Sequence, residues 1–100
     1  MSDVIFLVSV TKTQDEKDVW RETTETRRVF CRADSITQRE FFEAGRNGLN
    51  PEMKFTVFAG DYNGERTVEF HGNGFGVYRT FESGDIVELY CERKGGTNGQ

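Results

Sequence analysis

Short runs that alternate apolar and polar residues limit this chain to folds built from β-strands. The clearest runs cover residues 53–59, 66–71, 75–81 and 86–93. Successive side chains of a strand point to opposite faces, so each run has one apolar and one polar face. Glycine-rich turns such as Gly72-Asn73-Gly74 separate the runs. Short strands at regular spacing predict an all-β fold, either a small antiparallel β-barrel or a barrel-like sandwich.

Two more strands are predicted near the N-terminus, at Val4–Val10 and Val19–Ala33. The polar stretch Thr11–Asp18 between them predicts an exposed loop. The pattern leaves open whether Glu22–Glu25 is a flexible tip or part of an exposed hairpin, and it does not fix the conformation of residues 11–28. The apolar members of all these runs form the expected core: Phe6, Val8, Val29, Cys31, Phe55, Val57, Val68, Phe70, Val77, Val87, Leu89 and Cys91.

Residues 35–50 interrupt the β pattern with a short helix or loop insertion. Ser35 or Thr37 can cap a helix, because a Gln or Glu follows each of them three residues later. Glycines and Asn50-Pro51 then end it. The adjacent Phe41 and Phe42 would point about 100° apart on a helix, so one of them can face away from the core. The charged residues Glu40, Glu43 and Arg46 are expected to be exposed.

Length and composition indicate one domain, residues 1–94, followed by a polar, glycine-rich tail at residues 95–100 that is expected to be mobile. No apolar run approaches the roughly 20 residues that span a bilayer. No basic residue precedes the first apolar run, unlike in a secretory signal. Cys31 and Cys91 lie in strand patterns and are expected to be buried, reduced thiols, which fits folding in the cytosol.

The sequence contains no recognisable catalytic, metal or cofactor motif, and no enzyme is expected. His71 is the only histidine and is expected to be an exposed strand residue. The glycines of residues 72–76 resemble a phosphate-binding loop, but a strand rather than a helix follows them. Four glutamates, Glu65, Glu69, Glu88 and Glu92, are expected on the polar faces of strands.

The charge balance does not favour nucleic-acid binding, since 17 acidic residues oppose 13 basic ones and the net charge is −4. An OB-like module that binds single strands on aromatic side chains nevertheless stays open as the alternative. Tyr62 and Tyr78 are the aromatic residues least clearly assigned to the core.

Five short sequence segments, taken in their order along the chain, resemble the head-tail joining proteins (head closure or "stopper" proteins) of tailed bacteriophages and prophages. The resemblance covers about residues 4–96. Phe75 stands where the family commonly has Tyr, and residues 12–25 match poorly. The segments are Val29-Phe30-Cys31-Arg32-Ala33-Asp34-Ser35-Ile36, Glu40-Phe41-Phe42-Glu43-Ala44-Gly45, Asp61-Tyr62-Asn63-Gly64-Glu65, Val77-Tyr78-Arg79-Thr80-Phe81 and Asp85-Ile86-Val87-Glu88-Leu89-Tyr90-Cys91-Glu92-Arg93-Lys94.

This resemblance implies a structural virion protein at the head-tail interface. Such a protein assembles as a ring beneath the portal and adaptor, closes the DNA exit channel and gives the tail a docking platform. The implied partners are portal, adaptor and tail-completion proteins, other copies of the chain, and passing double-stranded DNA that is not bound sequence-specifically. No membrane contact is expected.

The resemblance also singles out the inserted segment, Ser35–Pro51, as the element that projects towards the channel or the adaptor. The isolated chain is expected to be monomeric or weakly associated, with polar contacts between ring subunits. The candidate gating or partner-contact residues are Arg39, Glu40, Phe41, Phe42, Glu43 and Arg46, and the candidate ring-contact residues are Arg27, Arg28, Glu88 and Glu92.

Overall fold

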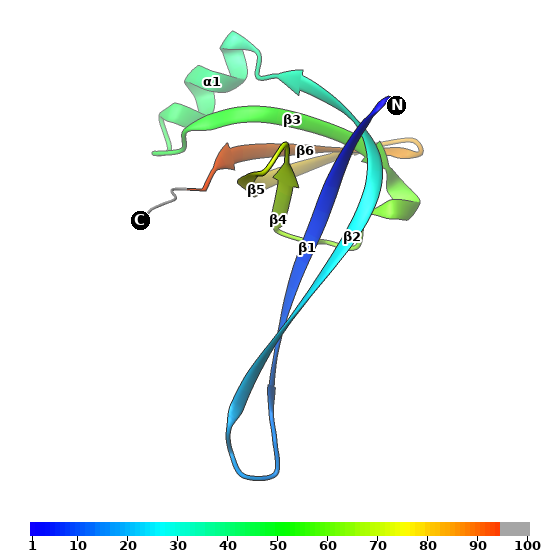
Figure 1. Ribbon diagram of the computed structural model, residues 1–100. Coiled ribbons are helices and arrows are strands. Elements are labelled where there is room, and N and C mark those ends of the chain that lie inside the picture. The colour runs from blue at the N-terminus through cyan, green and yellow to red at the C-terminus, as the bar shows by residue number, and fades with distance from the viewer. Residues whose placement is uncertain (95–100) are drawn as a thin grey trace.

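The computed structural model describes residues 1–94, which form a closed antiparallel barrel of six strands in the order β1-β2-β3-β6-β5-β4 (Figure 1). This confirms the prediction of a small all-β barrel with one short helical insertion. The tail at residues 95–100 lies outside the described residues. The elements are β1 (Asp3–Gln14), β2 (Trp20–Ser35), α1 (Gln38–Gly45), β3 (Pro51–Phe58), a 3-10 turn η1 (Ala59–Asp61), β4 (Thr67–Phe70), β5 (Asn73–Ser83) and β6 (Ile86–Arg93).

The turn between β4 and β5 illustrates how local sequence sets this topology. Phe70 pairs with Asn73, so only His71 and Gly72 connect the two strands. Both have positive φ, at 51° and 79°. Two-residue hairpin loops favour this conformation because its twist matches that of the strands. His71 is exposed as predicted, but it belongs to the turn and not to a strand.

The core fills the barrel with side chains from all six strands. Ten of the twelve predicted core residues are buried or pack against this cluster, with Phe70 at its edge. The prediction was wrong for Phe6, which is 40% exposed, and for Val8, which is only half-buried. The buried residues are Ile5, Leu7, Val29, Cys31, Phe55, Val57, Val68, Phe75, Val77, Val87, Leu89 and Cys91.

The error in β1 has a simple cause. Residues 4–8 are all apolar, so the run shows no alternation from which to choose its inner face. The pairing of Ile5 with Val29 and of Leu7 with Val68 turns the odd-numbered side chains inward. A shift of one residue exchanges the two faces of a strand completely. The burial of Phe75, where the resembling family has Tyr, shows that the Phe ring occupies a core position.

The first half of the segment predicted as a loop, Thr11–Asp18, is strand, and the second half is the turn between β1 and β2. β1 continues to Gln14, β2 begins at Trp20, and β1 pairs with β2 along the whole length of β1. Strand β4 pairs with β1 only as far as Val8, and β3 pairs with β2 only from Arg32. Residues 9–25 therefore form a two-stranded arm, which extends far below the barrel in Figure 1.

Cys31 and Cys91 are free and buried, as predicted. Burial raises the pKa of the Cys31 thiol to about 11 and that of Cys91 to about 12. Thiolate is the reactive form, so both residues act as small apolar core side chains.

Candidate functional site

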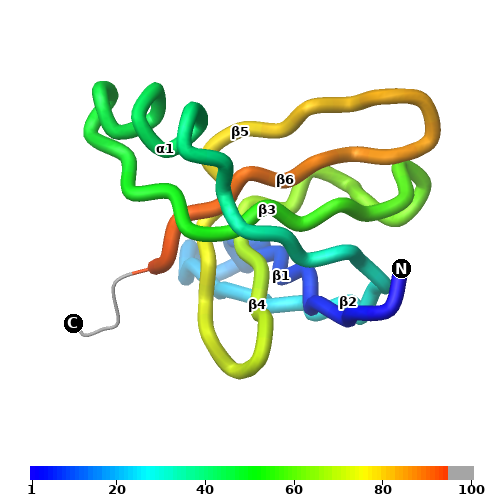
Figure 2. Tube along the Cα trace, turned by 90° about the horizontal axis from the view of Figure 1, so that it is seen from above, coloured from blue at the N-terminus to red at the C-terminus, as the bar shows by residue number. Residues whose placement is uncertain are grey.

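Helix α1 lies outside the barrel, where it covers the outer surface of β3 and β5 at one end (Figure 2). It begins where the sequence predicted a cap, with the Thr37 side chain accepting a hydrogen bond from the Glu40 N–H at 3.2 Å. Its end is closed by the Leu49 N–H, which donates to the Ala44 carbonyl, and by Gly48 at positive φ. An isolated helix of this length is weak in water, so its contacts with the barrel must hold it.

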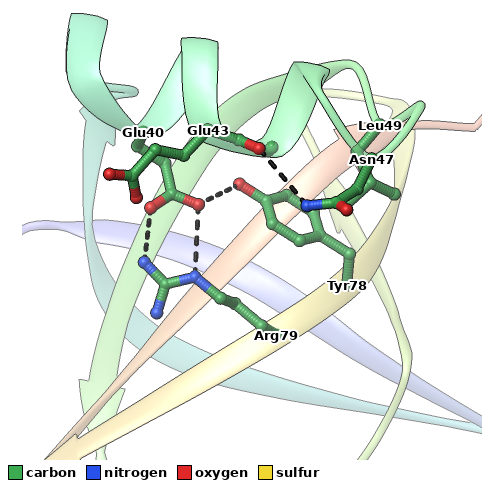
Figure 3. A pocket seen from close by; sticks show the side chains of 7 residues that line it. Glu40, Glu43, Asn47, Leu49, Tyr78 and Arg79 are labelled. Atoms are coloured by element: carbon green, nitrogen blue, oxygen red, sulfur yellow. Dashed lines mark hydrogen bonds and ion pairs between the residues drawn. The ribbon is translucent and has the colours of Figure 1, made fainter.

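The principal side-chain anchor of α1 is Glu40 (Figure 3). The Tyr78 hydroxyl donates to one of its carboxylate oxygens at 2.7 Å, and the Arg79 guanidinium bonds both of them. The Glu40 side chain is only 12% exposed, so the prediction that it is exposed was wrong. One helical turn further on, Ala44 is buried against the barrel and continues the same face.

A β-bulge in β5 supplies both of these partners. Val77 pairs with Cys91 and Arg79 pairs with Tyr90, so Tyr78 is one extra residue that has no paired residue on β6. A bulge of this kind re-aims side chains that would otherwise alternate. Here it lets the adjacent Tyr78 and Arg79 both reach Glu40. The guanidinium also lies 3.8 Å from the centroid of the Tyr90 ring, a cation–π contact.

These contacts set the charge states around the helix. The hydrogen bonds and positive charge of Arg79, with the Tyr78 hydroxyl, hold the pKa of Glu40 below its usual value, although burial opposes this. Burial and the neighbouring carboxylate raise the pKa of Tyr78. Glu40 is therefore ionised and Tyr78 is protonated at neutral pH. An open pocket beside them is lined by Glu40, Glu43, Ala44, Asn47, Leu49, Tyr78 and Arg79.

The remaining predicted residues of the segment face solvent. Phe41 is 46% exposed and Phe42 is 57% exposed, so both rings point away from the core. Their centroids are 5.9 Å apart in an edge-to-face arrangement. Arg39 pairs with Glu43 one turn later at 3.2 Å, and Arg46 is exposed. The helix thus presents an apolar pair flanked by charges.

Two of the four candidate ring-contact residues lie on β2, and one of these is engaged inside its own chain. Arg27 donates to the Glu65 carboxylate at 2.6 Å and to the Asp61 carbonyl at 2.7 Å. Burial acts to raise the pKa of Glu65, but hydrogen bonds from Arg27 and the Asn63 N–H outweigh it and leave the pKa low. Glu65 is buried and not on a polar strand face, so that prediction was wrong.

The other three candidate ring-contact residues differ in the contacts that they make within the chain. Glu88 accepts a hydrogen bond from the Tyr90 hydroxyl at 2.7 Å and lies 3.6 Å from the Lys54 ammonium. Glu92 accepts from the Asn50 N–H at 3.3 Å. Arg28 is exposed, and its guanidinium lies 5.5 Å from the centroid of the Phe30 ring. Strand β3 separates β2 from β6, so the four residues do not form one cluster.

Sequence reasoning did not find the partners of Glu40 and Arg27. The ion pairs Glu40–Arg79 and Arg27–Glu65 join residues 39 and 38 positions apart, and nothing local links their members. The only available signal was that Tyr78 fitted the core pattern poorly. The bulge explains this, because Tyr78 points out to Glu40.

Within residues 1–94, no group of three or more His, Cys, Asp or Glu side chains has the geometry of a metal site. None of the described helices has the length and apolar composition required to cross a membrane. Comparison with protein-family models and with curated proteins finds no match for this chain.

Proposed function

We propose that this protein is a structural component of the head-tail connector of a tailed bacteriophage or prophage. In this role it closes the DNA exit channel of the filled head and provides the platform on which the tail docks. The proposal places the protein in the virion, in contact with portal or adaptor proteins and with tail-completion proteins. It rests on the ordered resemblance of the sequence together with the properties of α1.

The observation that carries the proposal is the position of α1 and its two phenylalanines. The helix lies outside a closed barrel, shows both rings to solvent and makes its side-chain hydrogen bonds to the barrel through the Glu40 carboxylate. Exposed aromatic side chains of this kind suit contact with another protein. A short helix held by few contacts can also move without disturbing the barrel core.

The charge of the chain supports the same role. Duplex DNA gains nonspecific affinity from proteins whose basic residues neutralise its phosphates. A net charge of −4 gives no such attraction. An overall negative charge is compatible with a connector that lets DNA pass.

The test replaces Phe41 and Phe42 by Ser in the phage or prophage genome and measures DNA retention and tail joining of filled heads. We expect heads that package DNA but leak it, or that fail to join tails. The purified double variant should melt at the wild-type temperature, because both rings are about half exposed. Heads that contain the variant protein, keep their DNA and join tails normally would contradict the proposal for α1.

One observation favours the alternative function, a module that binds single-stranded nucleic acid. Phe6, Phe30 and Trp20 are exposed, and Arg28 lies next to Phe30, as on surfaces where bases stack. Trp20 is the only tryptophan, so its fluorescence reports binding directly. Strong quenching by single-stranded oligonucleotides at physiological salt would favour this module over the connector.

A further inference from the structure

An exposed apolar stripe runs along the outer surface of β1 and β2, from the barrel into the arm. The register pairs Val4 with Phe30 and Phe6 with Arg28, and it continues through Gln14 with Trp20. Since Ile5 and Leu7 point inward, the even-numbered residues of β1 and their partners share the outer face. We call this surface the outer stripe, and its apolar members are Val4, Phe6, Val8, Val10, Trp20 and Phe30.

A second apolar surface lies on the outer face of β3, β6 and β5, near the turn between β5 and β6. Phe58 pairs with Ile86, and Phe81 pairs with Glu88, two residues along β6 from Ile86. Phe58 is 49% exposed and Phe81 is 45% exposed. We call Phe58, Phe81 and Ile86 the end patch.

The barrel places these two surfaces on opposite walls. In the strand order β1-β2-β3-β6-β5-β4, the pair β1 and β2 lies across the barrel from the pair β6 and β5. Their outer faces therefore point in opposite directions. Two different surfaces on opposite sides of a subunit suit head-to-tail contacts, which form a ring when the rotation closes.

We propose that the outer stripe of one subunit binds the end patch of a second copy of this chain. This inference rests on the proposed function, because it assigns the contact between subunits of the connector ring. It differs from the polar contact expected from the sequence, since apolar surface provides most of the binding. The contact would give the arm, which extends past its own barrel (Figure 1), a role in binding a neighbouring subunit.

The exposed area agrees with an interface between copies. From the exposed fractions and the roughly 150–250 Å² that a large aromatic side chain can bury, the outer stripe offers on the order of 400 Å² of apolar surface. A standard interface buries about 800 Å² per partner, a little more than half of it apolar. The end patch is smaller, so the pair should associate weakly in the purified protein and strengthen when the connector aligns the subunits.

Charge is also complementary between the two surfaces. Arg28 lies on the outer stripe beside Phe6 and is exposed. Asp85 is exposed in the turn next to Ile86 of the end patch. Within residues 1–94 neither Arg28 nor Asp85 makes an ion pair. Each can therefore pair with the other across the contact.

The test measures association of the purified full chain by sedimentation from micromolar to millimolar concentration. A stripe variant carries Trp20→Ser and Phe30→Ser, and a patch variant carries Phe58→Ser and Phe81→Ser. We expect the wild-type chain to form species larger than dimers as its concentration rises. Each variant alone should remain monomeric, whereas an equal mixture of the two should stop at dimers, because only one complementary contact remains.

Matched controls make this result specific. The double variant Phe41→Ser, Phe42→Ser removes two equally exposed rings outside both surfaces and should associate like the wild type. Arg28→Asp should weaken association about tenfold, and Asp85→Arg in the same chain should restore it. Melting temperatures equal to that of the wild type show that the variants are folded.

Several outcomes would overturn the inference. The inference is wrong if the wild-type chain stays monomeric at millimolar concentration, or if the patch variant dimerises by itself through two outer stripes. It is also wrong if the control variant loses association, or if an oligonucleotide binds the outer stripe in preference to a second copy. None of these results affects the retention assay of α1 in filled heads, so failure of this interface and failure of the connector function can be distinguished.

Discussion

The two ends of the β1–β2 hairpin have the same pairing but different surroundings. At the barrel end, Ile5 and Leu7 have no exposed surface, because β3, β4, β5 and β6 close around them. In the arm, which is residues 9–25, no residue is buried, and Trp20 is 66% exposed. The same register thus continues from a region stabilised by burial into a region that has little of it.

The stability of the hairpin therefore comes from the neighbouring strands and not from the hairpin itself. An isolated two-stranded hairpin is marginal in water, whereas three or more strands with a shared apolar face are stable. The Arg27–Glu65 ion pair marks the boundary, since Arg27 is the last inward residue of β2 before the arm. The proposed contact with a second copy would give the arm the burial that its own barrel does not provide.

The largest expected effect comes from emptying the core. Leu89→Ala should reduce the free energy of unfolding by about 2–5 kcal/mol, because a fully buried site becomes a cavity. The matched substitution in the arm, Val10→Ala, should change it by no more than about 0.5 kcal/mol, since Val10 is 52% exposed. Urea unfolding of both variants measures the contrast. Equal losses would show that the arm is as strongly packed as the barrel.

A smaller effect is expected at the boundary. Arg27→Ala leaves the buried Glu65 carboxylate without its cation and should cost about 1–3 kcal/mol. Because folding lowers the pKa of Glu65, its contribution is present above the usual value of 4.5 and is lost as the pH falls through the lowered pKa. The variant and the wild type should therefore become more alike in stability in acid, which urea unfolding at neutral and acidic pH can check.

Removal of the arm should have a still smaller effect on stability. Replacement of residues 10–24 by Asn-Gly would close the hairpin between Ser9 and Glu25, which already pair. We expect the free energy of unfolding to change by less than about 1 kcal/mol, because the deleted residues bury little. Urea unfolding measures this, and loss of the folded barrel would contradict it. The same variant should no longer associate if the outer stripe binds a second copy.

The smallest global effect is expected for the anchor of α1. Glu40→Gln keeps the shape of the side chain but removes the charge that Arg79 and Tyr78 recognise. Amide exchange of α1 should accelerate at neutral pH, while exchange of the barrel strands stays unchanged. Glu43→Gln is the matched control, since Glu43 contacts Arg39 on the same helix and not the barrel.

The anchor also has a predicted pH dependence. Folding lowers the pKa of Glu40, so the stabilisation is present above the usual 4.5 and is lost as the pH falls through the lowered pKa. In acid, the rate of amide exchange of α1 in the wild type should therefore approach the rate in the Glu40→Gln variant. If the amide exchange rates of α1 are the same in the wild type and in Glu40→Gln at neutral pH, the Glu40 carboxylate does not hold the helix.

The amino-acid sequence was sufficient to predict the fold class, the positions of most strands and the position of the helix. These features depend on local patterns: the alternation in β3 and β6, the short turn at Gly72, and the cap at Thr37. Each is decided by the conformational preferences of a few consecutive residues. The exposure of at least one of Phe41 and Phe42 followed from the helical angle between adjacent positions.

Three features depend on tertiary contacts: the face of β1 that points inward, the length of the arm, and the partners of Glu40 and Arg27. A run of apolar residues carries no signal for its inner face until a neighbouring strand fixes the register. A polar strand such as residues 11–14 shows no apolar face from which to predict it. The ion pairs join residues that are distant in the chain, and they form only because the closed barrel and the bulge at Tyr78 bring these side chains together.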